Sequence, residues 1–129
     1  DIIMKLDMIG IIVEDMEEAV KFYEVLGFKV SDVIMENYVE LVSENIRISL
    51  NTKEMISGVY GFVPQLTGER IELAFLCNST NELDLKVTAL KDKGYEVFKE
   101  PWNAVWGQYY AIVLDADGNY ISLFCNDVK

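Results

Sequence analysis

The sequence contains no histidine. This absence excludes mechanisms that need an imidazole base, a serine–histidine pair or a histidine-ligated metal ion. Basic residues are also scarce, since 11 lysines and arginines stand against 22 aspartates and glutamates and give a formal net charge of −11. Phosphate groups are bound through Lys and Arg, so we expect neither nucleic acid nor an anionic membrane as a partner. The acidity mildly favours a neutral or cationic small ligand.

Long hydrophobic runs are missing, and cysteines are few. The apolar stretches IGIIV and AIVL are much shorter than the ~20 residues of a membrane span. We expect no secretory leader, because no charged segment followed by an apolar one opens the sequence. Cys77 and Cys125 each end an apolar run and are interpreted as small buried side chains. The spacing of the two cysteines is compatible with a disulfide, but without a secretory context we expect reduced thiols and a cytoplasmic location.

The chain repeats one pattern of strand, helix and three strands. Its 129 residues, 51% of them hydrophobic, suffice for the core of one domain. In the first copy, the run MIGIIVED leads to a capping box of Asp15 and Glu18, and Gly27 ends the helix. In the second copy, RIELAFLC leads to a helix with Leu83, Val87 and Leu90 on one face, which Gly94 closes. Each half is therefore predicted to be a βαβββ module.

We predict a single domain over residues 1–129, with module one at about 6–51, a linker at about 52–69 and module two at about 70–125. The linker is rich in apolar side chains, which include Met55, Ile56, Val59, Tyr60, Phe62 and Val63. The favoured interpretation is that it packs over a sheet edge. A lid or a dimer contact is the alternative.

Two segments carry a resemblance to a known family. IGIIVEDMEEAVKFYEVLGFKV resembles the opening module of the vicinal oxygen chelate superfamily, and AIVLDADGNYISLF resembles its closing motif. This superfamily includes glyoxalase I, extradiol dioxygenases and the fosfomycin- and bleomycin-resistance proteins. The resemblance runs from about Leu6 to Phe124. It implies an α+β fold of two βαβββ modules that form cupped mixed sheets with the helices on the outer faces. It also implies a homodimer, in which each cup is completed by the partner chain.

The resemblance further implies four metal-ligand positions, on the first and last strand of each module. In this sequence they are Met8, Ser49, Glu72 and Ser122. A thioether and two hydroxyls are poor ligands for a divalent ion, and one carboxylate cannot hold it alone. We therefore expect no metal ion, no cofactor and no metal-dependent catalytic residue.

Strand alternation indicates which side chains line the two cups instead, because residues two apart share a face. The segment EPWNAVWGQYY adds aromatic rings, and in the family this stretch borders the cup and contacts ligand. The alternative is that these rings only close the core. The predicted ligand-binding residues are Met8, Tyr38, Glu40, Arg47, Ser49, Glu72, Trp102, Trp106, Tyr109, Ser122 and Phe124.

Glu72 has two interpretations. A lone acid among apolar groups is costly unless it is paired, and Arg47 is the nearest candidate by strand position. In the other interpretation, Glu72 or Glu40 meets a positive group on the ligand. The Asp115–Asn119 segment DADGN is interpreted as a tight turn and not as a calcium loop, because the rest of such a loop is absent.

Three functions follow as hypotheses. The leading one is a metal-free protein that sequesters a small, partly aromatic molecule, with a positive charge on that molecule as an option, in the manner of the bleomycin-resistance branch. The alternative is a glyoxalase- or dioxygenase-like lyase or isomerase that uses an atypical site around Glu72 with a tyrosine as acid or base. The third is an interaction module whose cup no longer binds a ligand.

Overall fold

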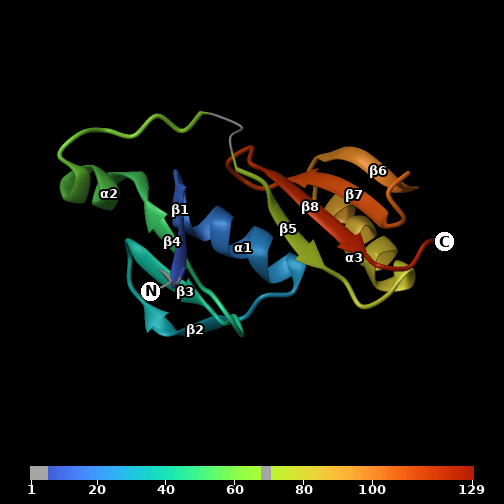
Figure 1. Cartoon of the computed structure of the whole chain (residues 1–129). Helices are drawn as coiled ribbons and strands as arrows, with labels where there is room; N and C mark the ends of the chain where they lie inside the picture. The colour runs from blue at the N-terminus through green and yellow to red at the C-terminus, as the bar shows by residue number, and fades with distance from the viewer. Residues whose placement is uncertain (1–5, 68–70) are drawn as a thin grey trace, which may run out of the picture. The chain divides into compact units, whose positions relative to one another are not determined.

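Figure 1 shows the computed structural model of the chain, which describes residues 6–67 and 71–129. The end of the predicted linker at Gly68 and Glu69, and the predicted start of module two at Arg70, lie outside the described residues. The chain divides into two compact units, with the boundary between Leu66 and Thr67. Among the described helices, none is long and apolar enough to cross a membrane.

Both units have the predicted βαβββ order. The first contains β1 (Met8–Val13), α1 (Met16–Leu26), β2 (Val30–Ile34), β3 (Tyr38–Leu41) and β4 (Arg47–Thr52). The second contains β5 (Leu73–Leu76), α3 (Thr80–Asp92), β6 (Val97–Asn103), β7 (Tyr109–Leu114) and β8 (Tyr120–Cys125). The strand orders are β1-β4-β3-β2 and β5-β8-β7-β6, and in each sheet the first and last strands pair in parallel while the others are antiparallel. The α+β prediction with two mixed sheets is confirmed.

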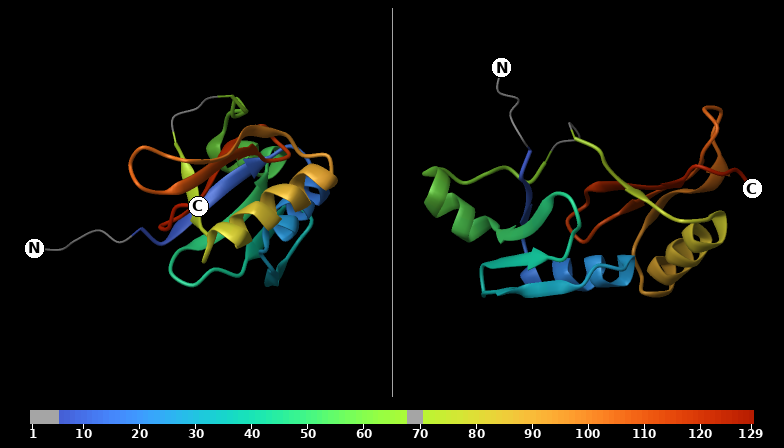
Figure 2. Two further views of the ribbon diagram at one scale, coloured as in Figure 1. Left: turned by 90° about the vertical axis from the view of Figure 1, so that its right-hand side faces the viewer. Right: turned by 60° about the horizontal axis from the view of Figure 1, so that its bottom comes forward.

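The helices begin and end where their capping residues predict. The Asp15 carboxylate accepts the backbone N–H of Glu18 at 3.1 Å, as expected of the capping box, and Gly27 ends α1 with a φ of 120°. Ser79 caps α3 in the same way, through the N–H of Glu82 at 3.0 Å. Each helix packs against its own sheet, α1 on β4 and α3 on β6, β7 and β8 (Figure 2).

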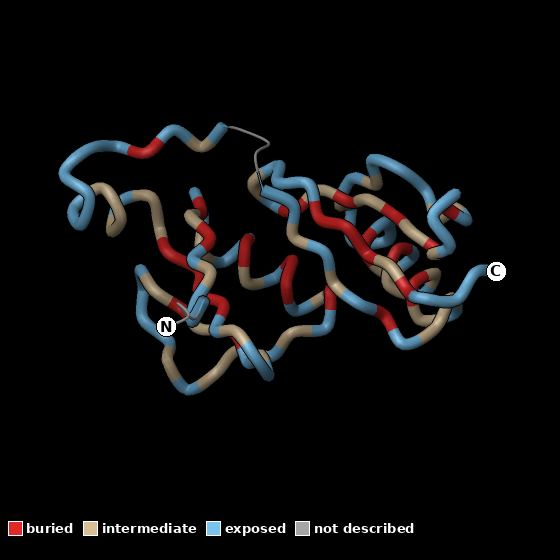
Figure 3. The backbone as a smooth tube through the Cα atoms, viewed as in Figure 1, coloured by how far each residue is buried: buried red, intermediate tan, exposed pale blue. Residues whose placement is uncertain are grey.

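Buried and less buried residues alternate along the strands β3 and β7 (Figure 3). In the second sheet, the alternate residues Ala111, Val113, Ile121 and Leu123 are fully buried on the side of α3. In the first sheet Val39 and Leu41 are buried, as predicted for the helix side. The residues between them therefore point to the opposite face, which in each sheet carries the candidate ligand-binding side chains except Tyr109.

The predicted linker contains a helix, α2 (Lys53–Tyr60), that the sequence analysis did not anticipate. Thr52 caps it by accepting the N–H of Met55 at 3.2 Å, and Gly61 ends it in the left-handed conformation. The helix contacts β4 and the edge strand β1, which agrees with packing over a sheet edge. Its end and the following residues stay exposed, since Val59, Tyr60, Phe62 and Val63 each keep more than half of their surface.

Candidate functional site

One face of the second sheet carries an apolar and aromatic row that crosses all four strands. Leu76 of β5 pairs with Phe124 of β8. Phe124 also pairs with Tyr110 of β7, which in turn pairs with Trp102 of β6. Side chains paired across neighbouring strands project to the same side, so the four form one continuous strip. We call this strip and its border the module-two face, which comprises Glu72, Leu76, Trp102, Trp106, Tyr110, Ser122 and Phe124.

The rings of the module-two face contact one another directly. Tyr110 stacks on Phe124 with ring centroids 6.1 Å apart. The edge-to-face contacts from Tyr110 are 5.4 Å to Trp102 and 5.3 Å to Trp106. Trp102 and Trp106 are 6.2 Å apart and nearly perpendicular. These are the geometries that aromatic pairs prefer, so the cluster is held together without a ligand.

Trp106 is exposed but fixed in position. It lies in the turn between β6 and β7 and keeps 58% of its surface. Its indole Nε1–H donates to Oε1 of Gln108 at 2.9 Å, and the Gln108 amide donates to Oδ1 of Asn126 at 3.0 Å. A large exposed ring that is held by hydrogen bonds loses little freedom when a ligand stacks on it.

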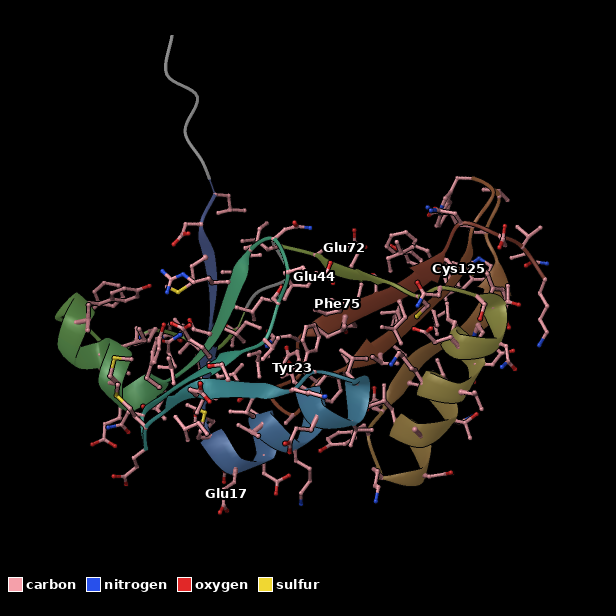
Figure 4. The ribbon with its side chains drawn as sticks, turned by 90° about the horizontal axis from the view of Figure 1, so that it is seen from below. Glu17, Tyr23, Glu44, Glu72, Phe75 and Cys125 are labelled. Atoms are coloured by element: carbon pink, nitrogen blue, oxygen red, sulfur yellow. The ribbon has the colours of Figure 1, made fainter. Side chains whose placement is uncertain are left out.

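Glu72 borders the aromatic row, just before β5 (Figure 4). Its Oε2 accepts the hydroxyl of Ser122 at 2.9 Å and the phenol of Tyr110 at 3.1 Å. Burial, together with the hydrogen bond to Glu72, raises the pKa of Tyr110, so its phenol stays protonated near neutral pH. Both donors are neutral and both bond to Oε2, and no ion pair joins Glu72 to a lysine or arginine within the described part of module two.

The corresponding face of the first sheet holds a charged cluster instead of an aromatic one. Glu40 Oε2 accepts the phenol of Tyr38 at 2.7 Å and forms an ion pair with Arg47 at 3.0 Å. Arg47 also pairs with Asp7 at 2.8 Å. The Tyr38 phenol further contacts the sulfur of Met8 at 3.5 Å. Four of the predicted site residues, Met8, Tyr38, Glu40 and Arg47, are thus brought together within module one.

Ser49 lies beside this cluster in a small buried polar group. It is fully buried, and its hydroxyl accepts the amide of Asn51 at 2.9 Å. Gly10 pairs with Ser49 across β1 and β4, and a Cβ at Gly10 would come within 3.2 Å of the Asn51 amide nitrogen. The missing side chain at position 10 therefore leaves the room that the Ser49 and Asn51 side chains use.

Tyr109 does not lie with the other predicted site residues. It is buried, and its phenol donates at 2.6 Å to Asp84 of α3, on the helix side of the sheet. Burial and the Asp84 carboxylate raise the pKa of Tyr109 to about 12. The neighbouring Tyr110 occupies the open face that we predicted for Tyr109. Ser122 pairs with Ile112, which lies two residues after Tyr110. Strand alternation therefore places Tyr110, and not Tyr109, on the same face as Ser122.

The pairing of Glu72 with Arg47 stays a prediction, because the two residues belong to different units of the chain. Arg47 takes Asp7 and Glu40 as partners within its own sheet, and Glu72 takes the two hydroxyls of Ser122 and Tyr110. Two carboxylates, on β3 and ahead of β1, thus already pair with the guanidinium inside module one.

The DADGN segment forms the predicted tight turn. Asp115 Oδ1 accepts the N–H groups of Asp117 at 2.9 Å and Asn119 at 2.8 Å, and Gly118 adopts a φ of 84°. The Asp115 side chain is buried and serves its own loop. This segment therefore contributes structure and not a binding group.

The family resemblance implies metal ligands at four positions, and the side chains found at these positions do not suit a divalent ion. Ser122 and Tyr110 both donate to Glu72 Oε2, so a metal ion there would displace two hydrogen bonds. Met8 offers a thioether that contacts the Tyr38 phenol, and Ser49 is engaged with Asn51. Among residues 6–67 and 71–129, no three His, Cys, Asp or Glu side chains gather as a metal site would need.

Comparison with models of known protein families identifies one superfamily. The model of the Glyoxalase/Bleomycin resistance protein/Dioxygenase superfamily matches residues 5–123. No curated protein matches the sequence.

Solved structures of low sequence identity share the fold. A glyoxalase-related enzyme from Fulvimarina pelagi superposes with a TM-score of 0.87 at 15% identity, covering 96% of this chain and 89% of that one. A glyoxalase/bleomycin resistance protein/dioxygenase family enzyme from Burkholderia phytofirmans PsJN gives 0.85 at 20% identity, with 95% and 98% covered. A lactoylglutathione lyase from Agrobacterium tumefaciens gives 0.69 at 15% identity, with 94% and 92% covered.

Proposed function

Since the chain belongs to the Glyoxalase/Bleomycin resistance protein/Dioxygenase superfamily, we propose that it is a metal-free member that binds and sequesters a small, partly aromatic, positively charged molecule on its module-two face. The observation that carries this proposal is the contact between Glu72 and the aromatic row. A carboxylate that accepts two hydroxyls, and has no ion-pair partner in the described part of its module, lies beside four stacked or edge-on rings. Aromatic faces and a carboxylate together recognise organic cations.

The two modules differ in the charge that they offer. Glu40 in module one is neutralised by Arg47, and the ion pair continues to Asp7. Glu72 in module two has no cationic partner among the described residues. A cationic ligand therefore gains more from Glu72 than from Glu40, which favours module two as its site.

The aromatic row supplies the apolar part of the binding energy. Leu76 keeps 60% and Trp106 keeps 58% of their surface. Burying such area against a ligand contributes about 25 cal/mol per Å², and a cation over an exposed ring adds ~0.5–1 kcal/mol. The row supports a flat ligand, because its rings already stand in a fixed arrangement.

We propose that ligand binding needs no metal ion, because of the side chains at Met8, Ser49, Glu72 and Ser122. Each of these side chains is engaged in a hydrogen bond or a sulfur contact, and only one of them carries a charge.

We further propose that the protein is a cytoplasmic homodimer. Two buried free thiols, Cys77 and Cys125, support a reducing compartment. The exposed apolar side chains of both sheets support pairing, since monomers rarely carry large apolar patches.

The proposal is tested by thermal shift and tryptophan fluorescence with a panel of small aromatic amines, on protein that has been dialysed against EDTA. Both tryptophans lie on the module-two face, so bound ligand changes their emission directly. We expect at least one amine to raise the melting temperature in the wild-type protein. The Glu72→Gln variant keeps the shape of the side chain and should bind that amine more weakly. Binding that appears only after a divalent ion is added would contradict the proposal.

An enzymatic function around Glu72 is the second candidate. The observation in its favour is the 3.1 Å contact between the Tyr110 phenol and a carboxylate with a free oxygen, a pairing that can move a proton. A metal-free lyase or isomerase should convert an α-keto hemithioacetal in EDTA, and Glu72→Gln should abolish this conversion. The absence of turnover, together with binding of aromatic amines, would leave the binding function.

A further inference from the structure

A lysine outside the predicted site lies on the same face. Lys99 of β6 pairs with Ile112 of β7, Ile112 pairs with Ser122 of β8, and Ser122 pairs with Ala74 of β5. This second cross-strand row runs directly beside the aromatic one. The Lys99 ammonium lies over the Trp102 ring, 4.0 Å from its centroid. Lys99 therefore borders the aromatic row at one sheet edge, as Glu72 does at the other.

The two charges at these edges are both without an ionic partner of their own. The ion pairs of the described residues join Lys21, Arg47, Lys53, Lys91 and Lys129 to carboxylates, but not Lys99. In a chain with twice as many acids as bases, an ammonium that rests on a ring and not on a carboxylate is unusual. Glu72, at the opposite edge, accepts the hydroxyls of Ser122 and Tyr110 and forms no ion pair with residues 71–129.

The two charges border the same aromatic strip. Lys99 and Ala74 are three strands apart in a register-matched row, so their Cα atoms are separated by about 14 Å at ~4.8 Å per strand. Glu72 lies two residues before Ala74, and its carboxylate reaches over the sheet to the phenol of Tyr110 on β7 at 3.1 Å. The Lys99 ammonium lies over the ring of Trp102, the cross-strand partner of Tyr110. A molecule that lies on the strip between the two side chains can therefore meet both charges.

We propose that the ligand is a zwitterion with a flat aromatic body, whose cationic end meets Glu72 and whose anionic end meets Lys99. This inference rests on the proposed function and adds a second charge of opposite sign to its ligand. Lys99 then acts as a specificity-determining residue: it favours molecules with an acidic group and disfavours simple cations. Electrostatic complementarity at two separated points selects a ligand by its length as well as its charge.

The test uses three matched probes on one ring: 4-(aminomethyl)benzoate, 4-methylbenzylamine and 4-methylbenzoate. Their affinities for wild-type protein are measured in EDTA by titration of backbone amide NMR signals. We expect the zwitterion to bind about fivefold more tightly than either singly charged probe. Lys99→Met should reduce zwitterion binding to the level of 4-methylbenzylamine. Glu72→Gln should reduce it to the level of 4-methylbenzoate. Lys29→Met removes an equal charge from module one and should change nothing.

The possible failures are distinguishable. Equal affinity of the wild-type protein for 4-methylbenzylamine and the zwitterion, or zwitterion binding that is unchanged in Lys99→Met, would overturn the zwitterion and leave the binding of an aromatic cation intact. The second result would mean that Lys99 only covers the Trp102 ring. A lack of binding by all three probes to the wild-type protein would overturn this inference together with the proposed function.

Discussion

The alternation along β7 decides which of two neighbouring tyrosines lies on the open face of the sheet. Tyr109 and Tyr110 are adjacent in β7, so their phenols project to opposite sides of the sheet. Tyr109 is buried against Asp84, whereas Tyr110 contacts Glu72 and three other rings. The composition of the stretch predicted aromatic contact with a ligand. Only the parity of the strand shows which residue can make that contact.

The Tyr109–Asp84 hydrogen bond gives a pH-dependent stability. Burial of Asp84 opposes its ionisation, but the bonds from Lys129 and Tyr109 outweigh it and lower the pKa of this carboxyl. A carboxyl whose pKa is lower in the folded state stabilises the fold above its unfolded value of about 3.9, and this contribution is lost as the pH falls through the folded pKa.

We therefore predict that Tyr109→Phe lowers the free energy of unfolding by ~1 kcal/mol at pH 7. The difference from the wild-type protein should shrink at pH 3, because this pH lies below the unfolded value of about 3.9 and closer to the lowered pKa of Asp84 in the folded state. Urea unfolding at the two pH values measures both quantities. An equal difference at pH 7 and pH 3 would show that the Asp84 charge has no part in it.

Gln108 is predicted to set the position of Trp106. Replacing it by Leu removes the acceptor of the indole N–H and the donor to Asn126. We expect the heteronuclear NOE of the Trp106 indole to fall, while that of Trp102, which is packed under Lys99, stays unchanged. Gln65→Leu, at an exposed position in the other unit, serves as the control. A Trp106 indole that stays rigid in Gln108→Leu would remove Gln108 from this role.

At the scale of elements, local signals predicted most of the fold. The cap at Asp15 and the apolar spacing of Leu83, Val87 and Leu90 were predicted from the sequence and are present in the structure. The cap at Ser79 is a further local signal that the sequence analysis did not name. Helix α2 was missed because its apolar residues were interpreted as a packed linker. Its signals were nevertheless present, since Thr52 lies three residues before Met55 and Gly61 closes the helix.

The site was less predictable than the fold, because it depends on contacts between strands. Register decides that Trp102, Tyr110 and Phe124 form one row, and no single segment of the sequence contains this information. The hydroxyl partners of Glu72 within module two lie on other strands, and sequence position does not give them. Strict alternation from Trp102 would place Lys99 on the opposite face of β6. The register between β6 and β7 shifts on both sides of Lys99, so simple alternation does not predict its face.

The cap at Asp15 gives a prediction for α1. Asp15→Ala removes the acceptor for the Glu18 N–H and should lower the free energy of unfolding by ~1 kcal/mol. Glu17→Gln removes one charge in the same turn without touching the cap, and its effect should be less than half as large. Urea denaturation of both variants provides the comparison. Equal losses would indicate that the charge near the helix N-terminus matters and that the hydrogen bond does not.

At the scale of the whole molecule, the exposed apolar side chains predict self-association. Leu76, Trp106, Phe62 and Val63 each leave more than half of their surface open. Sedimentation at micromolar concentration should show a species of twice the 14.7 kDa chain mass. A single species of 14.7 kDa would contradict the homodimer.

The central claim is that this chain binds a small aromatic ligand on the module-two face without a metal ion. Its two tryptophans both belong to that face, so their two indole N–H signals report on it alone. The most direct measurement follows these signals in EDTA while 4-(aminomethyl)benzoate is added. We predict that both shift and saturate together, and that zinc added in place of EDTA changes neither the shifts nor the affinity. Signals that stay fixed in EDTA and move only after zinc is added would contradict the account.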